Sequence, residues 1–160
     1  NTTIAGLTLE GQNSVASGLN VQVRGINDAT TPTVETSNFN FGSSNDYLVI
    51  GSSSGNSVDM GSGNDRLNVN YASVNDRFST GLGSDAVVFG GNITNTSVNL
   101  GSDGVQDVVR LAQGASINGL VITGADNSDI LFIGTTQYNY NSTDNNWINS
   151  TDPNDKKQFS

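Results

Sequence analysis

Five aspartates recur along the chain at nearly equal intervals, and each is followed directly by a short apolar segment. They are separated by 19, 20, 22 and 22 residues and are Asp46, Asp65, Asp85, Asp107 and Asp129. A period near 20 in a glycine-rich chain is typical of a solenoid in which each repeat forms one coil. Stacked coils would bring the five carboxylates into one column, where they could bind a cation or cap the turns.

Two interpretations of this column remain open. Coils joined through β-strands lie ~4.8 Å apart, and two carboxylates at that distance repel by roughly 3–4 kcal/mol at an effective dielectric constant near 20. A divalent cation with oxygen ligands would turn this repulsion into attraction. Alternatively, each Asp accepts backbone N–H bonds and caps its turn, as in an Asx-turn. We expect the cation, because uncharged Asn would serve as well for capping alone.

The turns that precede these aspartates are rich in glycine. They read GSSND at 42–46, GSGND at 61–65 and GLGSD at 81–85. They resemble the RTX (haemolysin-type) nonapeptide GGxGxDxUx, and the long Ser- and Asn-rich form is similar to repeats of cyanobacterial surface proteins. The resemblance implies a parallel β-roll with calcium held between turns by Asp carboxylates and turn carbonyls. The residues that it matches best are Gly61, Gly63, Asp65, Gly81, Gly83 and Asp85.

The chain also departs from that motif. Its first glycine is replaced by Phe41, Met60, Thr80 and Leu100, and the opposite turns carry no motif, so one row of ions is expected. The turns at 101–107 and 124–129 look longer and add Asp103 and Asp126, either as further ligands or as solvated loop charges. The full set of expected metal-binding residues is Asp46, Gly61, Gly63, Asp65, Gly81, Gly83, Asp85, Asp103, Asp107, Asp126 and Asp129.

Alternating apolar residues place strands on either side of this turn. After each Asp, ten positions of period two are all apolar and are expected to point inward: Leu48, Ile50, Leu67, Val69, Val87, Phe89, Val109, Leu111, Leu131 and Ile133. A second strand before each turn presents Phe39, Val58, Phe78, Val98 and Val121 inward. The sequence therefore predicts an all-β parallel β-solenoid (β-roll or β-helix) with two strands per ~20-residue coil and five to six coils.

The two ends lack this regularity. We expect a single domain over 1–160, in which residues 1–36 form an irregular first coil, a cap and a loop at 25–36, and residues 37–133 form the coils. Residues 134–160 are expected to form a capping hairpin and tail, with Tyr138, Tyr140 and Trp147 as its apolar content. Capping is needed because exposed terminal strands recruit other chains.

Composition excludes several functional classes. Asn, Ser, Gly and Thr supply 77 of the 160 residues, and 15 acidic residues face only 6 basic ones. Neither a basic patch for nucleic acid nor an apolar run of the ~20 residues that span a bilayer is present. Cys and His are absent, which removes disulfides, thiol chemistry and every His-based general base. A chain that begins at Asn1 is expected to be a mature or excised form of a secreted protein.

These observations predict a non-enzymatic, extracellular protein at the cell surface or secreted from it. We expect a structural calcium-binding β-solenoid that builds a surface layer, matrix or filament and self-associates end to end. The alternatives are an adhesin or glycan-binding module and a calcium-triggered folding and secretion module of a larger protein. Surface glycan is a possible partner, whereas nucleic acid and membrane insertion are not expected.

Overall fold

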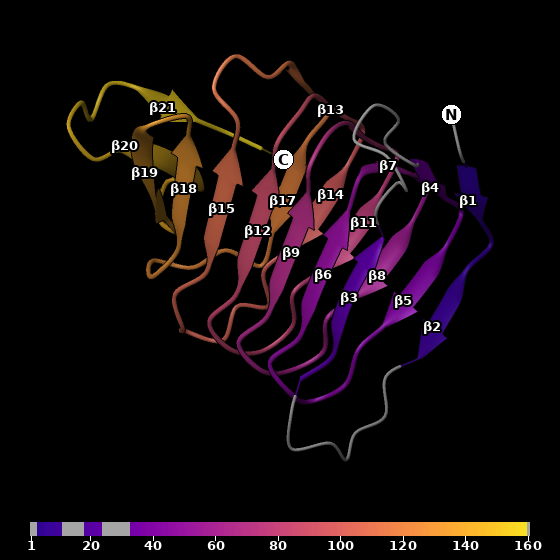
Figure 1. Cartoon of the computed structure of the whole chain (residues 1–160). Helices are drawn as coiled ribbons and strands as arrows, with labels where there is room; N and C mark the ends of the chain where they lie inside the picture. Colours follow the sequence, from indigo (N-terminus) through magenta and orange to yellow (C-terminus); the bar gives the residue numbers. More distant parts are fainter. Residues whose placement is uncertain (1–2, 11–17, 24–32, 160) are drawn as a thin grey trace.

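The computed structural model describes residues 3–10, 18–23 and 33–159. Within these residues the chain forms strands and turns, and none of them belongs to a helix that could cross a membrane. The strands stack into three sheets whose neighbours are about one coil apart in sequence, which is the topology of a parallel β-solenoid (Figure 1). The predicted fold class is therefore confirmed.

Each coil contributes one strand to each of three sheets, so the prediction of two strands per coil is wrong. The first sheet, sheet A, contains β1 (Thr3–Ala5), β4 (Thr33–Glu35), β7 (Ser52–Ser54), β10 (Ser73–Val74), β13 (Ile93–Thr94) and β16 (Ile117–Asn118). These strands are only two or three residues long and several are polar, which is why an apolar alternation does not reveal them. Thr33–Glu35 also corrects the loop predicted at 25–36, whose residues 25–32 lie outside the described part.

The other two sheets are the predicted ones. Sheet B contains β2 (Thr8–Glu10), β5 (Asn38–Asn40), β8 (Ser57–Asp59), β11 (Arg77–Ser79), β14 (Ser97–Asn99) and β17 (Val121–Thr123). Sheet C contains β3 (Asn20–Val23), β6 (Tyr47–Ile50), β9 (Arg66–Val69), β12 (Ala86–Phe89), β15 (Val108–Leu111) and β18 (Ile130–Ile133). Six coils result, and the glycine-rich turns connect sheet B to sheet C.

The interior is a continuous apolar column along the rod. Of the ten positions predicted to point inward in sheet C, all but the half-buried Ile133 are buried. Phe89 is 1% exposed and its ring lies 5.9 Å from that of Phe78 in sheet B, centroid to centroid. The two sheets therefore meet across one shared core, because alternate side chains of a strand point to one face.

One register in sheet B differs from the prediction. Val98 pairs with Ile122, not with Val121, and Ile122 is the buried residue of that strand. Val121 is half-buried and lies on the outer face. Consequently Asp129 follows its inward residue by the same seven positions as Asp65 follows Val58, and the turn at 124–129 is not longer than the earlier ones.

The C-terminal end is closed by antiparallel strands. β19 (Thr136–Asn141), β20 (Asn146–Asn149) and β21 (Lys156–Lys157) continue sheet C beyond β18, as the yellow end of Figure 1 shows. Tyr140 pairs with Trp147 across the hairpin, and Tyr138 and Trp147 are buried, which confirms the predicted hairpin. The tail also reaches sheet B, because the amide of Ile122 donates to the carbonyl of Phe159 at 2.8 Å.

Candidate functional site

The five repeated aspartates form one buried column at the start of the sheet C strands. Each lies immediately before its strand, and its carboxylate accepts a hydrogen bond from a main-chain amide of the preceding coil. The amide nitrogens of Asp46, Asp65, Asp85 and Asp107 lie 2.6, 2.7, 2.8 and 2.8 Å from Oδ1 of Asp65, Asp85, Asp107 and Asp129. The amide of Leu19 does the same to Asp46 at 2.6 Å. We call this set the aspartate column.

The column exists because the main chain leaves the strand pattern at this point. The amide of Arg66 donates to the carbonyl of Asp46 in the coil before, as ladder bonds do. One residue earlier, the amide of Asp65 donates instead to the carboxylate of Asp85 in the following coil. A buried N–H without a partner costs free energy comparable to a lost hydrogen bond, so the carboxylates stabilise the stacking of consecutive coils.

Burial makes the charge of these carboxylates costly. All five residues are at most 5% exposed. Burial raises the pKa of Asp65 to about 7 and that of Asp107 to about 8, and in each case nearby carboxylates raise it further while an accepted amide bond lowers it. For Asp85 and Asp129 the pKa is raised as well, again mainly by burial. With pKa values of about 7 and about 8, Asp65 and Asp107 therefore bind protons near neutral pH when no cation is present.

Two carboxylate oxygens in the column have no partner. Oδ2 of Asp65 and Oδ2 of Asp85 are buried and accept no hydrogen bond from the described residues. An ionised carboxylate with such an oxygen is strongly disfavoured in a protein interior. A proton on each group or a cation next to it would remove this cost.

The donor set fits amide capping better than a calcium site. Calcium takes six to eight oxygen ligands at 2.3–2.6 Å. Among residues 3–10, 18–23 and 33–159, no three or more acidic side chains are gathered so that they could hold one metal ion. Each Oδ1 of the column is already turned toward an amide, so calcium at these residues stays a prediction, with the two orphaned oxygens as its best donors.

The glycines of the motif are required because a side chain at these positions would collide with the main chain of the neighbouring turn. Gly61 and Gly81 have φ of 90° and 97°, a left-handed conformation that L-residues with a side chain rarely adopt. A Cβ on Gly81 would lie 1.7 Å from the carbonyl oxygen of Gly61, and one on Gly83 would lie 1.7 Å from that of Gly63. Successive turns thus touch through their main chains, and this contact requires glycine with or without an ion.

The two additional aspartates cap amides on the outside of the turns. Asp103 accepts from the amides of Gly83 and Val105 at 2.6 and 2.9 Å. Asp126 accepts from the amide of Gly104 at 2.8 Å and from the hydroxyl of Ser128, which lowers the pKa of Asp126. Their oxygens are therefore occupied by turn amides outside the aspartate column.

A second polar column was not anticipated from the sequence. It lies at the corner between sheets A and B and consists of Ser37, Asn56, Asp76 and Thr96, all buried. Asn56 accepts from the amide of Ser37 and Asp76 accepts from that of Asn56, both at 2.8 Å. Burial also raises the pKa of Asp76. The spacings of 19, 20 and 20 residues were the available signal, hidden because four residue types share the position.

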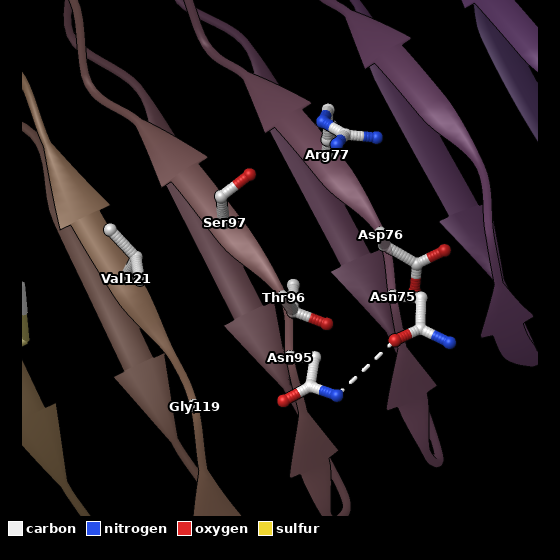
Figure 2. A pocket seen from close by; sticks show the side chains of 8 residues that line it. All are labelled: Asn75, Asp76, Arg77, Asn95, Thr96, Ser97, Gly119 and Val121. Atoms are coloured by element: carbon white, nitrogen blue, oxygen red, sulfur yellow. Dashed lines mark hydrogen bonds between the residues drawn. The ribbon is translucent and has the colours of Figure 1, made fainter.

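Outside this corner lies a shallow polar hollow of about 390 Å³. Figure 2 shows Arg77, Ser97 and Val121 side by side on three neighbouring strands, next to Asn75 and Asn95, whose side chains are hydrogen-bonded at 3.4 Å. The guanidinium of Arg77 has no hydrogen bond or ion pair with the described residues. The other described cationic groups have one of these or an aromatic contact: Arg66 with Asn68, Arg110 with Phe132, Lys156 with Asp144 and Lys157 with Asp155.

The fold and the two buried columns define the class: a three-sided parallel β-solenoid whose coils are joined by buried polar columns. Comparison of the chain with models of protein families, with curated proteins and with solved structures found no match. The likeness to RTX repeats therefore stays a resemblance of the turns.

Proposed function

We propose that the chain is a non-catalytic structural protein, a rigid β-solenoid module of an extracellular surface layer, matrix or filament. The observation that carries this proposal is the use of the repeated acidic residues. In the aspartate column the carboxylates accept hydrogen bonds from main-chain amides of the adjacent coil. The side chains of the repeat that could best bind a ligand or react therefore serve to hold the coils together. A continuous core and a closed C-terminal end support the same role.

Calcium binding belongs to this proposal as a modulator of stability. The orphaned oxygens of Asp65 and Asp85 favour a cation beside them. A scaffold of this kind folds through its apolar core and is stabilised further by the ion, whereas a calcium-triggered secretion module folds only when the ion is present.

Two measurements test the proposal. An antibody against the chain should label the surface or matrix of intact source cells. In addition, main-chain amides of β5 to β18 should exchange slowly with deuterium as one block in the presence of a chelator. Labelling only inside cells would contradict the scaffold, and amides that are protected only with calcium would favour the secretion module instead.

A second candidate, glycan binding, is favoured by the polar hollow. The side-chain amides of Asn75 and Asn95 and the Ser97 hydroxyl can both donate hydrogen bonds to sugar hydroxyls and accept them. The unpaired guanidinium of Arg77 only donates, and it suits a sugar carboxylate. A glycan array tests it. Binding that is lost in Arg77→Ala but kept in Arg66→Ala would support the adhesin interpretation, and no binding above background would contradict it.

A further inference from the structure

The two ends of the rod differ in how their strands are covered. At the C-terminal end, sheet C continues into the antiparallel cap and the amide of Ile122 in sheet B meets the tail. At the N-terminal end, β1, β2 and β3 are the last strands of their sheets and each pairs on one side only with a described strand. Figure 1 shows β1 and β2 at the right-hand end of the rod and β3 beside β6 as the last strand of sheet C. An edge of this kind is a template for another strand.

Apolar groups at this open end are more exposed than those inside the rod. Leu7 and Leu19 are 37% and 40% exposed, and Ile4, Leu9 and Val21 are only partly buried, whereas their counterparts in later coils are mostly closed off. The ten residues of the three edge strands include one charged residue, Glu10. Edge strands that avoid association commonly carry charges, and among the described residues of these three strands only Glu10 provides such protection.

We propose that the N-terminal end of the rod binds the same end of a second copy, giving a head-to-head dimer. This rests on the proposed scaffold function, because it states how two scaffold modules join. A second copy is the occupant that the chain itself supplies, since its C-terminal end is capped in sheets B and C. A closed dimer with a twofold axis follows, in place of an open filament.

The geometry of the end strands fits such a twofold axis. When the axis is perpendicular to the rod and passes through the corner between sheets A and B, it sets β1 against β2 of the second copy, antiparallel. β1 and β2 have three residues each and are separated by Gly6 and Leu7. Ile4 then lies opposite Leu9 of the second copy, and both are partly buried, as opposite residues of an antiparallel pair must share a face.

The same axis sets β3 against its own counterpart. With Gln22 opposite Gln22 of the second copy, Val21 lies opposite Val23, so the two half-buried valines face the joined core and the exposed Gln22 faces outward. In this register the single charged residue of the edges, Glu10, lies opposite Thr3 of the second copy. No like charges meet among the described residues of the three edge strands, and their apolar side chains join into one core.

A cysteine at the axis tests the orientation. The chain contains no cysteine, so Gln22→Cys introduces a single thiol that meets only its own counterpart in a head-to-head dimer. Antiparallel neighbours have Cβ atoms ~4.5–5.5 Å apart, close to disulfide geometry. Mild oxidation should give a disulfide-linked dimer at protein concentrations where Asn139→Cys, an exposed position on β19 in the cap, stays unlinked.

A charge pair tests the register without altering the core. Thr3→Lys would face Glu10 of the second copy and tighten the dimer, whereas Thr3→Glu would weaken it. Two such contacts per dimer should change the dissociation constant roughly 2- to 30-fold in opposite directions, measured by sedimentation equilibrium. A monomer at all concentrations, open-ended assemblies larger than dimers, or equal effects of the two variants would overturn the proposal, while surface labelling and amide protection still test the scaffold separately.

Discussion

The stability of the rod should fall as the pH rises in the presence of a chelator. The carboxyl of Asp65 has a pKa of about 7 in the folded chain against 3.8 as its ordinary value, and Asp107 is shifted in the same direction to about 8. The folded state therefore binds more protons than the unfolded state between about pH 4 and pH 8. The contribution of these two carboxyl groups to the free energy of unfolding is fully present below about pH 4, and it is lost as the pH rises through 7 to 8.

The magnitude follows from the shift. Each pKa unit corresponds to 1.36 kcal/mol, so the shift of about three units at Asp65 is worth on the order of 4 kcal/mol. Asp65→Asn keeps an oxygen for the Asp46 amide but cannot ionise. This variant should be more stable than the parent at pH 8 in chelator and should show a shallower pH dependence.

Urea denaturation at pH 5 and pH 8 measures this effect. Asp59→Asn is the matched control, because Asp59 lies in the same coil but is exposed, and it should leave the pH dependence unchanged. Calcium binds only ionised carboxylates, so its effect on stability should grow as the pH rises. Added calcium should therefore stabilise the parent more at pH 8 than at pH 5, and it should stabilise Asp65→Asn less than the parent. Stability that rises between pH 5 and pH 8 in chelator would refute the reasoning.

Three further substitutions, two of them paired with a control substitution, probe the packing. Gly81→Ala should destabilise the fold by several kcal/mol, because its Cβ would lie 1.7 Å from a carbonyl oxygen, whereas Gly104→Ala, also at positive φ but with open space around it, should cost about 1 kcal/mol; equal denaturant midpoints would contradict the stacking argument. Phe89→Ala should cost roughly 3–5 kcal/mol, the penalty for a buried aromatic side chain, and Leu82→Ala, at 57% exposure, about 0.5 kcal/mol or less in the same titration. Trp147→Ala should loosen the cap first, so amides of β19 and β20 should exchange faster while those of β12 stay protected; uniform loss of protection would show that the cap and the coils unfold together.

The sequence by itself determined the solenoid, the strands of sheets B and C, and the C-terminal hairpin. The reason is that a stacked coil repeats its inward positions at each turn, so Leu48, Leu67 and Val87 carry the period in the apolar pattern itself. Where the pattern is weak the prediction failed. Sheet A has two- and three-residue strands such as Ser73–Val74. In β17 three apolar or β-branched residues follow one another, so the sequence alone does not show that Ile122, and not Val121, pairs with Val98.

Only the tertiary structure decided what the aspartates do. Their spacing predicts one column, and the structure contains it, but spacing cannot tell whether a carboxylate turns toward an ion or toward an amide one coil away. That choice depends on which main-chain amides of the stacked turns have no carbonyl as hydrogen-bond acceptor. The amides that donate to a carboxylate instead are those of Asp46, Asp65, Asp85 and Asp107. The second column of Ser37, Asn56, Asp76 and Thr96 is likewise a tertiary property, because burial beside one another, and not residue type, is what its members share.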